Sequence, residues 1–125
     1  MSVKKVLVVE DTEPMRHLVK TILESHGFEV DTAEDGDIGL EKLASGDKYD
    51  LVILDVLMPR VNGWTVLEEL SKKSDSPPVI MLTTEDMYDD LISGYNMGAA
   101  YYIPKPFTSQ QLAYGVNMVL ESEAT

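Results

Sequence analysis

Five short apolar runs constrain the fold of this chain more than any other feature of its sequence. Three of them are almost uninterrupted by polar residues, a pattern typical of strands in a parallel sheet that is covered on both faces. We therefore predict a strand at each run. The runs are Lys5–Val9, Phe28–Thr32, Leu51–Leu54, Val79–Thr83 and Ala100–Ile103.

The segments between these runs have helical periodicity. In the first segment, apolar residues recur at the spacing of one helix face and predict a buried stripe. Thr12 or Asp11 can cap the start of this helix, and Gly27 can end it. The residues of the predicted stripe are Met15, Leu18, Val19, Ile22 and Leu23.

Four further helices are predicted from apolar positions that begin at Ile38, Trp64, Met87 and Leu112. Thr108 or Ser109 can cap the last of them. Strands and helices then alternate with short connections, which favours parallel pairing. We expect an α/β fold, a (βα)5 doubly wound five-stranded parallel sheet, that forms a single domain over residues 1–125.

Polar residues stand where the predicted strands end. Glu10 and Asp11 follow the first strand, Asp55 the third, Thr83 ends the fourth and Lys105 follows the fifth. Doubly wound folds place their functional residues in one crevice at the carboxyl ends of the strands. We therefore expect these five side chains to meet.

Three carboxylates that meet in one crevice repel one another unless a cation lies between them. A set of oxygen ligands without Cys or His selects a hard divalent ion, and Mg²⁺ suits a site with few protein ligands. Each acid could instead be an isolated helix cap or loop residue. Asp55 argues against that alternative, because a carboxylate that ends a buried strand is costly without a partner.

Lys105 lies between Pro104 and Pro106 and is the only cation in residues 74–125. A point charge at this place can bind a phosphoryl oxygen or pair with Asp55. Thr83 can donate a hydrogen bond into the same crevice, although the sequence does not decide between it and Thr84.

The acidity of the chain excludes several kinds of partner. Its net charge is −12, which disfavours direct binding to nucleic acid or to an anionic membrane surface. It has no cysteine, which excludes disulfides and thiolate metal sites. The apolar run Val6–Val9 is too short for a signal peptide or a membrane span, so we expect a cytoplasmic protein.

Together these residues resemble the receiver domain of bacterial two-component response regulators, and in particular the single-domain, chemotaxis-type regulators. Four motifs carry the resemblance, in order and over nearly the whole chain. The motifs are VLVVED at 6–11, LVILDVLMPRVNG at 51–63, VIMLTT at 79–84 and GAAYYIPKPF at 98–107. The resemblance implies the flavodoxin-like strand order 2-1-3-4-5.

The resemblance also implies a role for each site residue. Asp55 would be the phosphoacceptor of a phosphorylation-activated signalling switch. Thr83 and Lys105 would contact the phosphoryl group, and Thr83 and Tyr102 would form the switch. Mg²⁺ would be held by Glu10, Asp11, Asp55 and the backbone carbonyl of Leu57. Leu57 and Glu85 would modulate dephosphorylation.

The implied partners are a sensor histidine kinase or a phosphotransfer protein, and a downstream protein target that the sequence does not identify. The domain would catalyse its own phosphorylation and dephosphorylation without being an enzyme in the usual sense. A phosphorelay intermediate, or a receiver cut from a longer regulator with an output domain, would look the same. Glu10 departs from the family pattern, in which Asp is frequent at this position.

The implied output surface is formed by the fourth helix, the fifth strand and the fifth helix. It is either a solvated acidic face or a docking site for a basic or aromatic-seeking partner. DNA-binding members of the family usually dimerise here through paired basic and acidic residues. Residues 74–104 contain no Lys or Arg, so we expect a monomer. The acidic and tyrosine residues of this surface are Asp86, Asp89, Asp90, Tyr95, Tyr101 and Tyr114.

Two other protein classes use similar patterns. A flavodoxin-like FMN carrier needs a phosphate loop rich in Ser, Thr and Gly after its first strand, where this chain has EDTEPM. A phosphatase of the haloacid dehalogenase type needs a second Asp two residues after its nucleophile, where Leu57 stands. His17 and His26 are expected at the surface, and Trp64 is expected to serve packing.

Overall fold

A computed structural model of the chain describes residues 3–56, 58, 63–73, 75–84, 86–87 and 98–124. Its five strands form one parallel sheet in the order β2-β1-β3-β4-β5, as the resemblance implies. The strands are β1 (Lys5–Val9), β2 (Glu29–Ala33), β3 (Leu51–Asp55), β4 (Val79–Thr83) and β5 (Tyr101–Pro104). The predicted bounds of β1 and β4 are confirmed. β3 extends one residue beyond its predicted end, and β2 and β5 each begin and end one residue later than predicted.

Four helices are described between and after these strands. They are α1 (Glu13–Ser25), α2 (Gly36–Ala44), α3 (Gly63–Ser71) and α5 (Ser109–Ala124). The helix that the sequence predicts from Met87 onward lies mostly outside the described residues.

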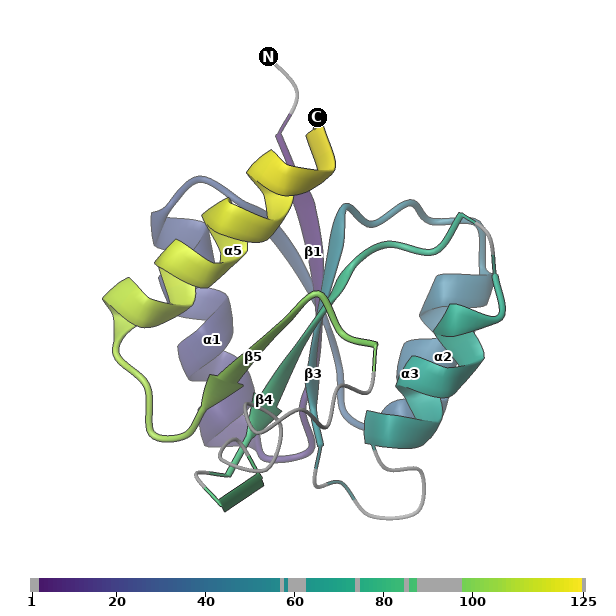
Figure 1. The fold of residues 1–125 in the computed structure, drawn as a ribbon, viewed down its shortest axis with the longest axis horizontal. Coiled ribbons are helices and arrows are strands. Elements are labelled where there is room, and N and C mark those ends of the chain that lie inside the picture. The colour runs from purple at the N-terminus through teal and green to yellow at the C-terminus, as the bar shows by residue number, and fades with distance from the viewer. Residues whose placement is uncertain are drawn as a thin grey trace.

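Helices cover both faces of the sheet, so the inner strands β1, β3 and β4 are buried on both sides. Figure 1 shows α1 and α5 on one face and α2 and α3 on the other. Alternate residues of β1 divide between the two layers: Val6 and Val8 pack with α1 and α5, and Leu7 and Val9 pack on the side of α2 and α3. This two-sided burial is the physical reason for the uninterrupted apolar runs.

One residue of the predicted stripe on α1 is exposed. Val19 and Leu23 are completely buried, but 45% of Leu18 is accessible to solvent. At 3.6 residues per turn, Leu18 lies roughly 120° around the helix from the midpoint between Val19 and Leu23. The prediction that Leu18 is buried is therefore wrong, because α1 contacts the sheet along a narrower line than the sequence pattern suggests.

The ends of two helices follow the predicted signals. Gly27 adopts a φ of 90° after α1, a left-handed conformation that glycine tolerates well, and its N–H donates to Glu24 O. At the start of α5, Thr108 Oγ1 accepts from Gln111 N at 3.0 Å, and Gln111 Oε1 accepts from Thr108 N at 2.8 Å. This reciprocal capping box confirms Thr108 as the cap.

A polar cluster ties β2, α2 and the residues before β3 together. Asp31 accepts from Lys42 Nζ at 2.9 Å and from Tyr49 OH at 2.7 Å, and Lys5 Nζ lies 5.0 Å from the centre of the Tyr49 ring. Burial acts to raise the pKa of Asp31, but the bonds from Lys42 and Tyr49 outweigh it and hold that pKa below the ordinary 3.8. The cluster lies away from the carboxyl ends of the strands and supports the fold.

Within the part of the chain that the structure describes, no helix is both long enough and apolar enough to cross a membrane.

Candidate functional site

Three carboxylates meet where β1 and β3 end. Val9 and Leu54 are paired in the sheet, so Glu10, which follows β1, comes beside Asp55, the last residue of β3. One carboxylate oxygen from each of Glu10, Asp11 and Asp55 lies within 4.8 Å of the other two. The structure therefore brings together the three acids that the sequence singles out.

This cluster is buried rather than spread over the surface. Glu10 is 1% exposed and Asp55 3% exposed, while Asp11 is half-buried. Burial, followed by the charge of Asp55, raises the pKa of Glu10 to about 7. Carboxylates held this close in a nearly dry site require positive charge between or beside them.

Lys105 supplies one positive charge from the far side of the cluster. Its Nζ lies 2.9 Å from Asp55 Oδ1, and its backbone N–H donates to Thr83 O at 2.7 Å. The peptide bond between Lys105 and Pro106 is cis. The hydrogen bond to Thr83 fixes the backbone of Lys105, and the ion pair with Asp55 fixes the position of its Nζ.

Thr83 and Thr84 differ in burial and in hydrogen bonding. Thr83 is 1% exposed, and its buried Oγ1 has no hydrogen-bond partner among the residues that the structure describes. Thr84 Oγ1 instead accepts from Met87 N at 3.2 Å. Thr83 is the last residue of β4, and Thr84 follows it with its hydroxyl already bonded to the backbone. These observations favour Thr83 over Thr84 as the residue with a hydroxyl available to a ligand.

Glu10 is held by residues that the sequence analysis did not assign to the site. Thr12 donates to Glu10 Oε1 from its hydroxyl at 3.0 Å and from its backbone N–H at 3.2 Å. Arg16 Nη1 donates to the Glu10 carbonyl oxygen at 2.9 Å. The sequence shows Thr12 only as a helix cap, because Thr at this place is a common N-cap. Its side chain makes no capping bond.

Gly63, the first residue of α3, lies directly against the backbone that follows Asp55. Its N–H donates to Val56 O at 2.9 Å. A Cβ at this position would stand 2.8 Å from Val56 Cα and would also collide with the Asp55 carbonyl oxygen. The glycine in the motif LVILDVLMPRVNG is thus required by a close approach of two backbone segments.

Tyr102 lies on β5 beside β4, paired with Met81. It is half-buried, packs against the core on the side of α2 and α3, and its hydroxyl accepts from Ala99 N at 3.2 Å. Tyr101 packs on the other face, where its ring touches the position that a Cβ of Gly115 would take. The two adjacent tyrosines therefore belong to different layers.

Two other predicted site residues, Leu57 and Glu85, lie outside the described residues. The same holds for Asp89, Asp90 and Tyr95 of the implied output surface. Asp86 and Tyr114 are exposed, and His17 and His26 are exposed as predicted. Trp64 is half-buried against the core of the α2 and α3 side, which confirms its packing role.

The residues present fit a hard divalent cation. All three acids offer oxygen atoms within reach of one another, and within the described part of the chain Glu10 Oε2 is buried without a hydrogen-bond partner. A buried acceptor of this kind is costly unless something binds it. An oxygen-only donor set with this geometry suits Mg²⁺.

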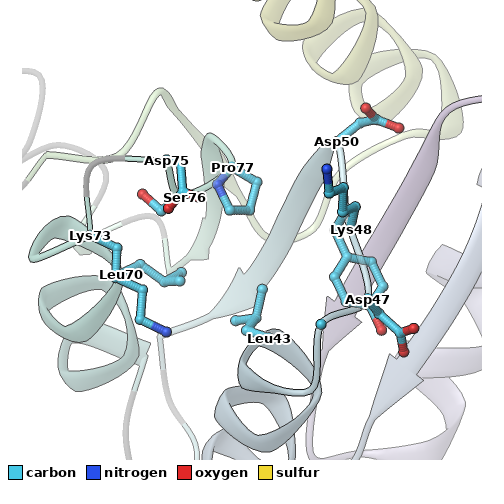
Figure 2. Close-up of a pocket in the computed structure, with 11 residues that line it drawn as sticks. Leu43, Asp47, Lys48, Asp50, Leu70, Lys73, Asp75, Ser76 and Pro77 are labelled. Atoms are coloured by element: carbon cyan, nitrogen blue, oxygen red, sulfur yellow. The ribbon is translucent and has the colours of Figure 1, made fainter.

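A cavity of about 510 Å³ lies elsewhere, at the amino end of the sheet. Figure 2 shows that residues from α2, from α3 and from the segments before β3 and β4 surround it, among them Leu43, Leu70 and Pro77. Its lining contains no residue of the carboxylate cluster. This cavity and the carboxylate cluster are therefore separate features of the molecule.

Comparison with known proteins agrees with this fold. The family model of the response regulator receiver domain matches residues 6–117. The chain therefore belongs to the response regulator receiver domain family, whose members act in two-component signalling.

Among curated proteins, the transcriptional regulatory protein CpxR homolog of Haemophilus influenzae is 39% identical over 121 residues, which are 97% of this chain and 52% of that protein. The transcriptional activator protein IrlR of Burkholderia pseudomallei is 40% identical over 116 residues, 93% of this chain and 50% of that protein. The chain thus spans about half the length of these relatives.

Solved structures give the same result for the fold. A response regulator receiver domain protein from Clostridium thermocellum has a TM-score of 0.87 and 32% identity, with 98% of each chain covered. The chemotaxis protein CheY4 of Vibrio cholerae has a TM-score of 0.80 and 33% identity, with 94% of this chain and 99% of that chain covered.

Proposed function

We propose that this chain is a signalling switch in which Asp55 accepts a phosphoryl group from a phosphohistidine of a sensor histidine kinase or a phosphotransfer protein. One observation carries the proposal. Asp55 is buried between two other carboxylates on one side and Lys105 Nζ, at 2.9 Å, on the other. A nucleophile in this setting can receive an anionic group only where positive charge is already in place.

In the transfer, an oxygen of Asp55 forms a bond to phosphorus while the bond from phosphorus to the histidine nitrogen breaks. A carboxylate is a weak nucleophile, so the surrounding charges determine the rate. A Mg²⁺ ion held by Glu10, Asp11, Asp55 and the backbone carbonyl of Leu57 would shield the carboxylates and stabilise the phosphoryl oxygens.

Lys105 and Thr83 act on the same phosphoryl group from the side of β4 and β5. Lys105 Nζ can move from Asp55 Oδ1 to a phosphoryl oxygen, since it already lies within hydrogen-bond distance of the carboxylate. Thr83 Oγ1 has no partner and can donate to another phosphoryl oxygen. These two contacts replace hydrogen bonds to water that the phosphoryl group loses when it enters a buried site.

The signal then passes from Thr83 to Tyr102. Thr83 is paired in the sheet with Pro104, two residues beyond Tyr102. A shift of Thr83 toward a bound phosphoryl group opens space next to β5, and the half-buried Tyr102 ring can turn inward into it. We propose that this movement changes the surface of the fourth helix, β5 and α5, where a downstream protein binds.

A second candidate is a receiver that controls an output domain in a longer regulator. The relatives above favour it, since two of them are called transcriptional regulators and are about twice as long as this chain. The phosphoryl chemistry is the same in both cases. The self-catalysed loss of the phosphoryl group, its modulation by Leu57 and Glu85, a phosphorelay role and a cytoplasmic location belong to the same proposal.

The decisive experiment is incubation with acetyl phosphate and Mg²⁺ followed by intact-mass analysis. We expect the mass to increase by one phosphoryl group in the wild-type chain and not in the Asp55→Asn variant. Omission of Mg²⁺ should prevent the increase. A wild-type chain that gains no mass with acetyl phosphate, and that binds neither Mg²⁺ nor beryllofluoride, would contradict the proposal.

A further inference from the structure

Thr12 occupies the N-cap position of α1, but its side chain does not cap the helix. Its backbone is extended, with φ −92° and ψ 129°, as is usual for an N-cap residue. In that position the hydroxyl normally accepts a hydrogen bond from an amide of the first turn. Here the hydroxyl turns back and donates to Glu10 Oε1 at 3.0 Å.

The backbone of Thr12 makes a second bond to the same oxygen. Thr12 N donates to Glu10 Oε1 at 3.2 Å, so one carboxylate oxygen receives two donors from one residue. The other oxygen, Oε2, is buried and has no hydrogen-bond partner. Hydrogen bonds therefore hold Oε1 of the carboxylate, and Oε2 remains available to bind a cation.

Glutamate needs such a restraint more than aspartate does. It has one more rotatable bond, and fixing a longer side chain costs more conformational entropy. Arg16 restrains the backbone of Glu10, because its Nη1 donates a hydrogen bond to the Glu10 carbonyl oxygen at 2.9 Å. With the backbone and Oε1 both fixed, the Glu10 carboxylate is held within the acid cluster, and its buried Oε2 is the oxygen that remains for a ligand.

We infer that Thr12 is a positioning residue for the cation site, whose hydroxyl holds Glu10 so that Oε2 is the oxygen presented to Mg²⁺. This inference rests on the proposed function, because it takes the acid cluster to be a Mg²⁺ site. This role requires no contact between Thr12 and the ion, only the bonds from Thr12 to Glu10 Oε1. It acts in the way that residues behind metal ligands generally act, by fixing the orientation of a ligand.

The test compares Mg²⁺ affinity, measured by titration calorimetry, in the wild-type chain and three variants. Thr12→Val keeps the shape of the side chain and removes the donor, and we expect Mg²⁺ to bind about tenfold more weakly, the usual size of effect for such a residue. Thr12→Ser restores the hydroxyl and should bind within about twofold of wild type.

Thr21→Val is the matched control. Thr21 lies on the same helix, is exposed, and its hydroxyl approaches only His17 Nε2, at 3.5 Å, among the contacts described. It should bind Mg²⁺ as wild type does. The melting temperature of the metal-free protein should be nearly the same in all four proteins, because the Thr12 side chain makes no capping bond.

A double-mutant cycle with Glu10→Ala covers the case in which Thr12→Val also lowers the melting temperature. If Thr12 acts through Glu10, its replacement has no further effect on Mg²⁺ affinity once Glu10 is gone. A loss of affinity that persists in the Glu10→Ala background would overturn the inference. So would a Thr12→Ser variant as weak as Thr12→Val.

The two proposals fail in different ways. A wild-type chain that binds no Mg²⁺ and accepts no phosphoryl group would overturn the proposed function and this inference together. A wild-type chain that binds Mg²⁺ and is phosphorylated, with a Thr12→Val variant of unchanged affinity, would overturn this inference alone.

Discussion

Lys105 Nζ lies 2.9 Å from Asp55 Oδ1, although the two residues are 50 positions apart in the sequence. The Asp55 side chain is 4% exposed and that of Lys105 25% exposed, so the pair is shielded on the carboxylate side and open to solvent on the ammonium side. In the proposed transfer, this asymmetry would let the lysine move from the carboxylate to an incoming anion while its ammonium group stays in contact with solvent.

Removal of the Lys105 charge should slow phosphorylation of Asp55. For Lys105→Met we expect the rate with acetyl phosphate and Mg²⁺ to fall about 100-fold, the scale of losing one preorganised electrostatic contact. The rate is measured by intact mass over time. Lys72→Met is the control, because Lys72 is exposed and pairs with Glu69 on α3. A Lys105→Met variant with the wild-type rate would contradict the assigned role.

Replacement of Gly63 should disturb both the fold and the site. A Cβ there meets backbone atoms of Asp55 and Val56, which have little freedom to move. We expect Gly63→Ala to lower the free energy of unfolding by about 2 kcal/mol and to slow Asp55 phosphorylation. Urea unfolding measures the first effect, and intact mass the second.

Gly115→Ala is the matched control for this change. A Cβ at Gly115 approaches the Tyr101 ring at 3.0 Å and the Ile103 side chain at 3.1 Å, and side chains can shift. The replacement also gains about 1 kcal/mol, because alanine favours the helical conformation more than glycine does. We expect Gly115→Ala to change the free energy of unfolding little. If Gly63→Ala and Gly115→Ala destabilise the protein equally, the backbone contact at Gly63 is not the cause.

Much of this site could be predicted from the sequence because its residues stand at the ends of strands. Periodicity and apolar runs locate the strand ends, and parallel strands bring their carboxyl ends to one edge. Glu10, Asp55 and Lys105 meet for that reason, and the structure places them as the strand pattern predicts.

Other features depend on tertiary contacts that a local pattern does not contain. Leu18 fits the helical period but lies beyond the contact line between α1 and the sheet. Thr12 has the residue type of a cap, yet its hydroxyl finds a buried carboxylate two residues away. The need for glycine at position 63 arises from how closely α3 approaches β3, which no spacing in the sequence records.

The cluster of Asp31, Lys42 and Tyr49 should stabilise the fold in a pH-dependent way. Because the pKa of Asp31 in the folded chain lies below its ordinary value of 3.8, its contribution is present above that value and is lost as the pH falls through the folded-state pKa. We expect Asp31→Asn to cost about 1 kcal/mol at neutral pH, since the carboxylate is partly exposed to solvent.

Urea unfolding of the wild type and of Asp31→Asn at several pH values tests this prediction. The difference between the two proteins should shrink toward zero as the pH falls through the folded-state pKa of Asp31, which lies below 3.8. Lys48→Met, on an exposed lysine just before Tyr49, is a control that should leave the acid dependence unchanged. A difference that stays constant down to acid pH would contradict the assigned role of the Asp31 charge.

The phosphorylated chain should remain a monomer. DNA-binding receivers pair basic with acidic residues across the face of the fourth helix, β5 and α5, but residues 74–104 of this chain contain no Lys or Arg. On the described part of that face, Asp86 is exposed and Tyr114 is 64% exposed. Two acidic copies brought together here would repel each other.

Sedimentation with and without beryllofluoride and Mg²⁺ should give the mass of one chain, with Asp55→Asn as the control. A beryllofluoride-dependent dimer that the Tyr114→Ala variant fails to form would disprove the prediction and assign this face to self-association.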